Sequence, residues 1–250
     1  MKLSIVVSIY NSHGVLARQA KYFKRMALPN DVEFVFVDDG SDPPFDIRDY
    51  DLPNLSIYAT GQKLAWTQGL GRNLGAEKAQ GEYLLMTDVD HIISREAINW
   101  ARGYHGSKAQ FKRFFGVLLE DGTLTQDLTT LASYGLDVKH LKPWRGLYAS
   151  VHMNTFAIRR DIFMELGGYN PRYSLVGYHP VTRSGDDCHF NTKWNHYAVQ
   201  HDLPTDLGPS IYMFPIGRYH IRGETNPMGL FHNLSYDGVQ RMTKGEELAT

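Results

Sequence analysis

Two carboxylates, Asp88 and Asp90, stand one residue apart at the end of the apolar run 83–87. The run predicts a buried strand. Because side chains alternate along a strand, residues two apart are expected on the same side of it. Like charges this close repel each other unless a cation lies beside them, and a hard divalent cation with oxygen ligands suits such a pair. The structural alternative is a polar strand end that leads into a loop.

Two further acidic pairs stand where loops or helices begin. Asp38 and Asp39 follow the apolar run 32–37, and Asp186 and Asp187 follow Gly185. The first pair precedes Gly and Ser, a composition typical of a turn, and the second is placed to cap a helix. A carboxylate of the first pair can accept from a nucleoside N–H, and one of the second pair, with its pKa raised by burial and by its neighbour, is also a candidate general base. Both pairs therefore keep a structural and a chemical interpretation.

An α/β fold with a mostly parallel sheet flanked by helices is predicted to present these groups. Apolar runs over 3–9 and 32–37 indicate buried strands, and the helical spacing of 15–27 separates them, which makes a βαβ unit. Ligands of such sheets bind at the carboxyl ends of the strands, where Tyr10-Asn11-Ser12 and Asp38-Asp39 stand. Further elements are expected as a strand at 55–59, a helix at 69–79, a helix from Ser94, strands at 111–119 and 148–158, a helix at 160–166 and a helix from about Asp186.

Composition excludes several classes of protein. The chain has 250 residues, a formal net charge of -1 and 42% hydrophobic residues, so no global field draws it to nucleic acid or to an anionic membrane. Cys188 is the single cysteine, which favours a reducing, cytoplasmic setting. No segment reaches membrane-spanning length, and the apolar run after Lys2 is too short for a signal peptide.

Four motifs, in this order, resemble those of family 2 glycosyltransferases with the GT-A fold. They are Val7-Ser8-Ile9-Tyr10-Asn11, then Val37-Asp38-Asp39-Gly40-Ser41-Asp42, then Arg72-Asn73-Leu74-Gly75-Ala76 with Gly81-Glu82-Tyr83 and Asp88-Val89-Asp90, and finally Gly167-Gly168-Tyr169-Asn170 with Gly185-Asp186-Asp187. The last block is also similar to the C-terminal galactosyltransferase motif of related families. Asp186 stands where the family usually has Glu, and Asn170-Pro171 replaces its usual Asp-Glu.

The resemblance implies transfer of a sugar from a nucleotide-diphosphate sugar, with a UDP-sugar favoured, to a hydroxyl of a glycan or other acceptor. Asp38 or Asp39 is then expected to bind the base or ribose, and Arg72 to face the diphosphate. Asp187 lies at the position of the family's catalytic base, with Asp186 as its substitute. Attack opposite the diphosphate inverts configuration, although some related families retain it. The expected nucleotide-sugar contacts are Ser8, Tyr10, Asn11, Asp38, Asp39, Arg72 and Asp88.

A metal site with Mn²⁺ or Mg²⁺ is part of the same implication. Asp90 is expected as a direct ligand and Asp88 as a ligand or as a contact of the ribose or of a metal-bound water. A downstream histidine often completes such sites, and we expect His220, with His232 second. Imidazole beside carboxylates favours Mn²⁺ over Mg²⁺. His91 is expected to point away from the ligand side.

The chain is expected to form a single GT-A domain with a smaller acceptor-side subregion. The expected division is a nucleotide-sugar half at 1–93, an acceptor and catalytic half at 94–222 and a flexible lid or tail at 223–250. Two other functions use similar features. A nucleotidyltransferase would also use carboxylates and a metal, but it would have a glycine-rich basic loop after the first strand. A carbohydrate-binding domain without catalysis would not need Asp88, Asp90, Arg72 and Asp187 together.

Overall fold

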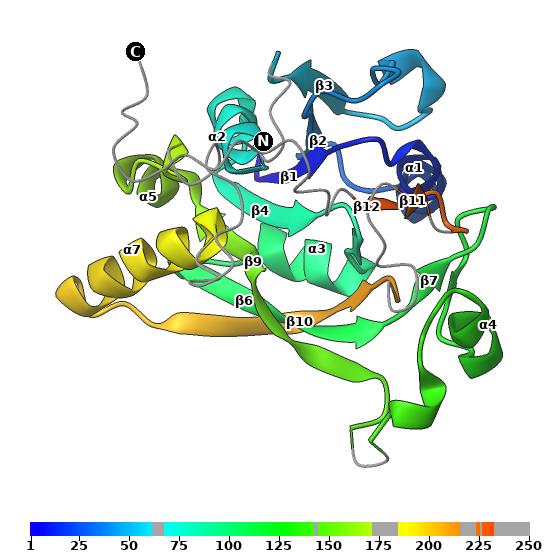
Figure 1. Ribbon diagram of the computed structural model, residues 1–250. Helices are drawn as coiled ribbons and strands as arrows, with labels where there is room; N and C mark the ends of the chain where they lie inside the picture. The colour runs from blue at the N-terminus through cyan, green and yellow to red at the C-terminus, as the bar shows by residue number, and fades with distance from the viewer. Residues whose placement is uncertain (62–67, 143–144, 172–184, 216–223, 226, 233–250) are drawn as a thin grey trace, which may run out of the picture.

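An eight-stranded mixed sheet forms the centre of the molecule (Figure 1). The computed structural model describes residues 1–61, 68–142, 145–171, 185–215, 224–225 and 227–232. Six of the eight strands run in one direction, and β9 and β5 run against them, so the predicted mostly parallel α/β fold is confirmed. In sheet order the strands are β3 Leu55–Ala59, β2 Val32–Asp38, β1 Leu3–Ile9, β4 Tyr83–Asp88, β9 Tyr148–Arg159, β6 Lys108–Phe115, β10 Thr205–Met213 and β5 His91–Ile92.

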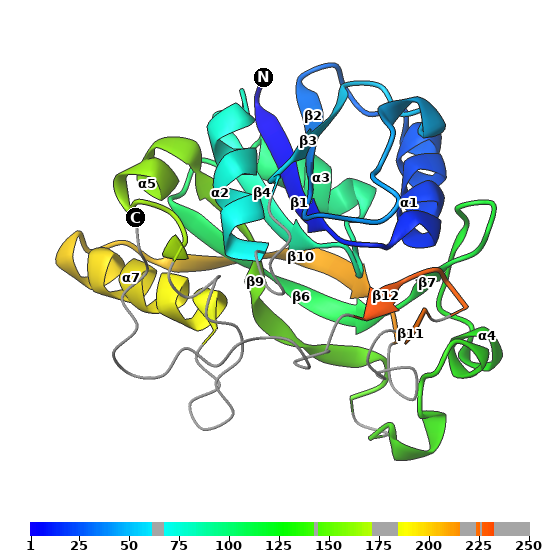
Figure 2. The same ribbon diagram turned by 45° about the horizontal axis from the view of Figure 1, so that its top comes forward.

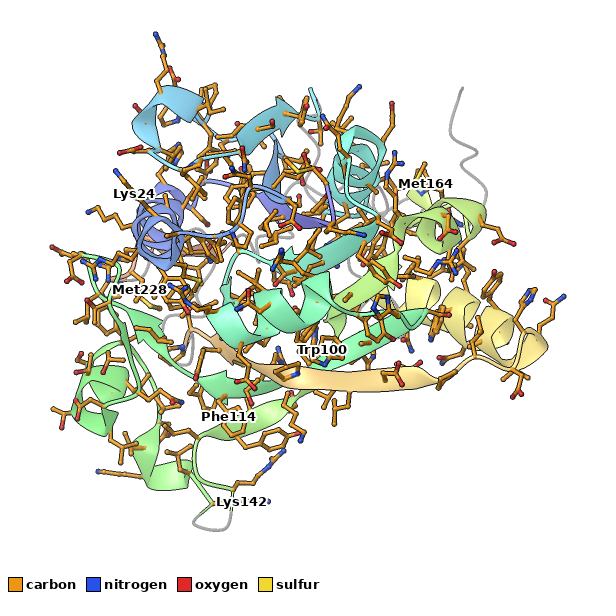
Figure 3. The ribbon with its side chains drawn as sticks, turned by 180° about the vertical axis from the view of Figure 1, so that it is seen from behind. Lys24, Trp100, Phe114, Lys142, Met164 and Met228 are labelled. Atoms are coloured by element: carbon orange, nitrogen blue, oxygen red, sulfur yellow. The ribbon has the colours of Figure 1, made fainter. Side chains whose placement is uncertain are left out.

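Helices cover both faces of this sheet, because its strands alternate between two hydrophobic cores. On one face, Leu3, Ile5 and Val7 of β1 pack with α1 and α3. On the other face, Val6 of β1 and Leu84 of β4 pack with α2, α5 and α7. The helices are α1 His13–Met26, α2 Gln68–Lys78, α3 Arg95–Arg102, α4 Leu128–Ser133, α5 Arg160–Glu165 and α7 Asp186–Gln200. Figure 3 labels Trp100 on α3, where it stacks on Tyr104.

The glycines of α2 bring this helix unusually close to β1 (Figure 2). A Cβ added at Gly75 would lie 2.4 Å from Val6 Cγ1, and one at Gly71 would lie 2.5 Å from Ser8 Oγ. Distances this short do not occur for real Cβ atoms, so only glycine fits at either position. Because of this close packing, Arg72 on the same helix reaches the carboxyl end of β4.

Shorter elements form a third hydrophobic cluster at one end of the sheet. It includes Val117, Leu131, Phe214, Met228 and Leu230. The elements around it are the 3₁₀ helix Val138–His140 and the strand pairs β7 Val117–Leu118 with β8 Leu124–Thr125 and β11 Glu224–Thr225 with β12 Phe231–His232. A second 3₁₀ helix, Ile47–Asp49, lies beside β3 instead.

The described part of the C-terminal segment packs against α1 (Figures 1 and 3). Met228 and Leu230 are buried, and Arg18 Nη2 of α1 donates to the Pro227 carbonyl at 3.2 Å. A Cβ at Gly229 would lie 2.5 Å from Gly14 Cα. Residues 227–230 are therefore anchored in this structure. The predicted lid over 223–250 otherwise lies largely outside the described residues.

Several element boundaries differ from the sequence-based predictions. The strand β10 was not predicted, the predicted strand 111–119 is divided into β6 and β7, and α1 begins at His13 instead of Val15. The predicted subdivision at 93 crosses a single sheet, because β9, β6 and β10 continue it beyond β4. None of the helices in the described ranges is long and apolar enough to cross a membrane.

Candidate active site

The carboxyl ends of β1 and β2 carry two loops that hydrogen bonds tie together. Asn11 has a positive φ of 46°, and its Oδ1 accepts from the Asp42 backbone N–H at 2.8 Å. The Asn11 N–H in turn donates to Ser41 Oγ at 2.9 Å. Asn and Asp tolerate this left-handed conformation better than most residues. Asn11 therefore fixes the loop after β1 against the Asp-Gly-Ser loop after β2.

Asp38 and Asp39 have different environments in this loop. Both oxygens of the buried Asp38 accept backbone N–H groups, from Ser41 at 2.9 Å and from Phe45 at 3.1 Å. Asp38 therefore organises the loop itself. Asp39 is half-buried and accepts from Thr60 Oγ1 at 3.2 Å. Of the two carboxylates expected to contact a nucleoside, Asp39 is the more accessible.

Ser8 of β1 and Tyr10, which follows this strand, are also expected to contact the nucleotide, but their side chains differ in exposure. The Ser8 side chain is buried beneath α2, beside Gly71. Tyr10 is half-buried in the loop that follows the strand. Tyr10 therefore lies nearer to solvent at the carboxyl end of β1, and Ser8 contributes mainly to the packing of α2.

Arg72 and Asp88 form a buried ion pair behind the end of β4. Arg72 is 1% exposed; its Nη2 donates to Asp88 Oδ1 and its Nη1 to the Tyr169 hydroxyl at 2.7 Å. Gln68 Nε2 also donates to Asp88 Oδ1. Burial opposes ionisation of Asp88, but the Arg72 charge, together with the smaller contributions of the nearby histidines and of the Gln68 hydrogen bond, keeps the pKa of this carboxyl below its usual range. Asp88 is thus held as a charged, oriented carboxylate.

Asp88, Asp90 and His91 gather at one point, within 4.8 Å of one another by their candidate ligand atoms. β4 ends at Asp88, and a turn at Val89 and Asp90 leads into β5. The two carboxylates converge as predicted, and both retain some exposure to solvent. Converging carboxylate oxygens with an open side fit a hard divalent cation, so the donor set agrees with a metal site. The prediction that His91 points away is wrong.

The hydrogen bonds of His91 fix its tautomer. A guanidinium only donates, so Nε2, 3.0 Å from Arg113 Nη1, must accept. Nδ1 then carries the proton and donates to Thr155 Oγ1 at 2.8 Å. Burial lowers the pKa of His91 to about 4, which agrees with a neutral ring. Nδ1–H lies 3.7 Å from Asp88 Oδ2 and 3.9 Å from Asp90 Oδ1. His91 therefore lies beside the two carboxylates with its Nδ1 proton donated to Thr155, and neither ring nitrogen has a lone pair free for a metal.

Asp186 and Asp187 occupy the first turn of α7, after Gly185 as N-cap. Asp186 is buried, and burial raises the pKa of its carboxyl although the Arg72 charge opposes this rise. Asp186 Oδ1 accepts from the Asp187 N–H at 2.9 Å, and Asp187 Oδ1 accepts from the Cys188 N–H at 2.7 Å. Asp187 is half-buried and more accessible than Asp186. Both carboxylates therefore stabilise the helix start, and Asp187 is the one that a substrate can reach more readily.

The structure thus gathers the predicted residues into two neighbouring groups. One group consists of the loops that contain Asn11 and Asp38–Asp39. The other consists of Arg72, Asp88 and Asp90, and the Arg72 charge also acts on Asp186. His220 lies outside the described residues, and the side chain of His232 in β12 is also outside them. Sequence reasoning missed the support of Gln68, Thr155 and Arg113. Only the position of His91, directly after the acidic pair, gave a signal in the sequence.

Comparison with known proteins agrees with this geometry. Residues 4–102 match the family model described as "Glycosyltransferase like family 2". The poly(ribitol-phosphate) beta-glucosyltransferase of Bacillus spizizenii is 32% identical over 112 residues. That match covers 43% of this chain and 17% of the relative, so the chain corresponds to a small part of that protein.

Solved glycosyltransferase structures share the fold. TarS of S. aureus superposes with a TM-score of 0.52 at 19% identity, over 85% of this chain and 36% of TarS. TarS 1–349 in complex with UDP-GlcNAc gives the same TM-score over 58% of that chain. The mannosyltransferase PcManGT from Pyrobaculum calidifontis, in complex with GDP-Man and Mn²⁺, gives 0.51 at 16% identity, over 88% of this chain and 59% of PcManGT.

These similarities span the elements that build the site. The family match begins in β1 and ends in α3, so it includes the loops after β1 and β2, the helix with Arg72 and the acidic turn after β4. The structural similarity extends over most of the chain. The resemblance predicted from the motifs is confirmed: residues 4–102 match the glycosyltransferase-like family 2 model, and the chain shares the GT-A fold of the solved glycosyltransferases.

Proposed function

We propose that this domain transfers a sugar from a nucleotide-diphosphate sugar to an acceptor hydroxyl with the help of a divalent cation. The observation that carries the proposal is the convergence of Asp88 and Asp90 beside the buried Arg72, at the carboxyl end of β4. Open α/β sheets bind ligands at this edge. The complexes of related folds with UDP-GlcNAc and with GDP-Man and Mn²⁺ support the same class of donor.

Each part of the site has a defined task in this proposal. Asp39 and Tyr10 contact the nucleoside, and we favour uridine because the TarS relatives include UDP complexes. Asp90 and Asp88 would hold Mn²⁺ or Mg²⁺, which when bound would supply positive charge for the diphosphate leaving group. Arg72 and Gln68 keep Asp88 oriented and charged. Because Arg72 is buried against Asp88 and Tyr169, it acts through Asp88 in this arrangement.

Asp187 is the proposed general base. It accepts the proton of the acceptor hydroxyl while the oxygen attacks the anomeric carbon and the nucleoside diphosphate departs. Attack from the side opposite the diphosphate inverts configuration at that carbon. Asp186, which is buried and close to the field of Arg72, stabilises the helix start beside it.

A donor screen tests the proposal without knowledge of the acceptor. UDP-glucose, UDP-GlcNAc and GDP-mannose are incubated with the protein and Mn²⁺ or Mg²⁺, and release of the nucleoside diphosphate by slow hydrolysis is measured. Release of pyrophosphate from nucleoside triphosphates and sugar phosphates would instead indicate a nucleotidyltransferase. Absence of diphosphate release from all donors, together with absence of nucleotide-sugar binding, would overturn the proposal.

Removal of Asp90 should abolish this metal-dependent reaction. We expect Asp90→Ala to reduce hydrolysis by about 10²-fold or more, the usual range for loss of a group that stabilises developing charge. Thermal unfolding should change little, because Asp90 lies in a partly exposed turn. The matched control is Asp49→Ala, which removes an exposed carboxylate of the 3₁₀ helix Ile47–Asp49. Full activity of Asp90→Ala, or of the wild type in excess chelator, would contradict the metal assignment.

A further inference from the structure

The long strand β9 departs from regular pairing beside the active site. Gln110 of β6 pairs with Phe156, but two residues later Lys112 pairs with Val151. The chain therefore advances by five residues on β9 where it advances by two on β6, so β9 contains three extra residues here. Bulges of this kind redirect side chains and are frequent next to active sites. The extra length falls within residues 152–155.

The pairing with β4 places this bulge level with the acidic turn. β4 and β9 pair from Tyr83↔Arg159 to Met86↔Phe156. One residue further, Thr87 Oγ1 lies 3.4 Å from Thr155 Oγ1, and Thr155 also bonds His91. Residues 152–154 therefore lie beyond the paired end of β4, where the chain turns through Asp88 and Asp90.

His152 presents a hydrogen-bond donor in this bulge. Its Nδ1 accepts from the Asn154 backbone N–H at 3.2 Å, so in the neutral ring Nε2 carries the proton. Burial lowers the pKa of His152, which favours the neutral ring near pH 7. Its electrostatic neighbours include Asp88, from the metal side, and Asp187, from α7. The ring therefore lies in the fields of the leaving-group site and of the proposed base.

Asn154 presents a complementary acceptor. Its Oδ1 is buried and has no hydrogen-bond partner in the part of the chain that the structure describes. An unsatisfied buried polar atom costs about 1–3 kcal/mol, and such groups are rare in folded proteins unless a ligand completes them. A hydroxyl group would supply the missing donor. Asn154 and His152 thus offer an acceptor and a donor from the same bulge.

We propose that the bulge of β9 is a sugar-hydroxyl subsite, in which His152 Nε2–H and the Asn154 side-chain amide bind hydroxyl groups of a sugar ring between Asp88 and Asp187. A ring with neighbouring hydroxyls can both donate and accept, which matches this pair. The subsite rests on the proposed glycosyl transfer and specifies which residues recognise the sugar. The sugar can belong to the donor or to the acceptor, and the experiment distinguishes the two.

The test compares binding of nucleotides with and without a sugar. Isothermal titration with Mn²⁺ measures UDP and GDP against UDP-glucose, UDP-GlcNAc and GDP-mannose. The variants are His152→Phe and Asn154→Leu, which keep the approximate size and remove the hydrogen-bonding group. Met153→Leu is the control, because it changes the same bulge without loss of a polar group. His152→Gln, which restores a neutral donor, should recover part of the effect and serves if the Phe variant does not fold.

A donor-sugar subsite predicts that both variants weaken binding of a nucleotide sugar about 5- to 10-fold, the equivalent of one neutral hydrogen bond. Binding of UDP and GDP should stay unchanged. An acceptor subsite predicts normal binding of all nucleotides and normal donor hydrolysis, with transfer to a sugar acceptor such as glucose reduced. Variants that match Met153→Leu in binding, hydrolysis and transfer would overturn the subsite alone. A wild-type protein that binds no nucleotide would overturn the proposed function as well.

Discussion

Neighbouring carboxylates of this site have different environments although their residue types are the same. Asp38 is saturated by backbone N–H groups, whereas Asp39 is half-buried. Asp186 is buried near Arg72, whereas Asp187 is partly accessible at the start of α7. An Asp-Asp motif in the sequence does not show which of its two carboxylates is buried and which is accessible. The backbone around each residue decides which carboxylate remains available to a substrate.

Substitution of each member of the second pair should separate the two tasks. We expect Asp187→Asn to leave donor affinity nearly unchanged and to lower transfer by about 10²-fold or more, since a general base is lost. Asp186→Asn should retain more activity, because the Asp186 carboxylate is buried and accepts from the Asp187 N–H, and so is less accessible to an acceptor. Titration of donor binding and steady-state transfer rates measure both effects. A larger loss of transfer in Asp186→Asn than in Asp187→Asn would assign the base to Asp186. If both variants kept full activity, the two residues would serve only to stabilise the start of α7.

At the residue scale the acidic pair was predictable but its histidine was not. Two carboxylates after an apolar run identify a strand end from local pattern alone. His91 lies in β5 and pairs with Met213 of β10. Its side chain is oriented by a hydrogen bond from Arg113 of β6. These partners are distant in sequence, and β10 was not predicted. The side-chain direction of His91 therefore depended on contacts that no local pattern contains.

At the scale of elements, α7 packs on β6 over a buried lysine. Lys108 Nζ lies 4.8 Å from the ring centroid of Phe156 and 5.2 Å from that of Trp194. Asn191 Oδ1 is 3.4 Å away. Within the described ranges no carboxylate forms an ion pair with it. Burial lowers the pKa of Lys108 to about 7. Charge–ring contacts and one amide therefore offset only part of the cost of burying this charge.

Replacement of this lysine should stabilise the protein most at low pH. Between about pH 7 and 10.5 the unfolded lysine holds a proton that the folded one has lost, so wild-type stability rises with pH in this window. Below pH 7 the penalty is complete. We expect Lys108→Met to raise the free energy of unfolding by about 1–4 kcal/mol at pH 6, with a smaller gain at pH 9. Urea unfolding measures this difference. The exposed Lys112→Met is the control, and a destabilised Lys108→Met at both pH values would contradict the expectation.

The contact of the C-terminal segment with α1 depends on two glycines. Gly229 has a φ of +75°, and an added Cβ would lie 2.5 Å from Gly14 Cα. We expect Gly229→Ala to detach residues 227–230 from α1 and to accelerate hydrogen exchange there. Gly61→Ala is the matched control, because its φ is +69° but nothing lies within 4 Å of its Cβ. Equal exchange of residues 227–230 in the two variants would contradict the expectation that the close Gly14–Gly229 contact holds this segment.

Most elements followed from periodicity, and the missed strand has a specific reason. Gly208 and Pro209 interrupt β10, and its register with β6 shifts between Gly208 and Ser210. Proline has no N–H to donate and usually ends a strand pattern. Here the bulge accommodates it, so tertiary pairing overrides the local signal. The extra residues of β9 escaped prediction in the same way, because a bulge shows only against a partner strand.

At the scale of the whole molecule, the site combines residues from two parts of the chain that share one sheet. Asp88 and Asp90 come from the part of the chain that the family model matches, and Asp186 and Asp187 come from beyond it. Arg72 and Tyr169, linked at 2.7 Å, join the two parts across 97 positions. The sequence predicted a single domain and the motifs in both parts of it. It did not predict the hydrogen bond between Arg72 and Tyr169, because no local pattern pairs residues so far apart.

The central position of β4 has a consequence for the growing chain during synthesis. Once residues 1–102 have left the ribosome, β1 can pair with β4, but β9, its other neighbour, is not yet made. The buried apolar face of Leu84 and Met86 would then border an open strand edge. Unpaired apolar edges promote association between chains. A truncated chain of residues 1–102 should therefore aggregate in light scattering, where the whole chain stays monodisperse, and the nascent protein needs protection until β9 arrives.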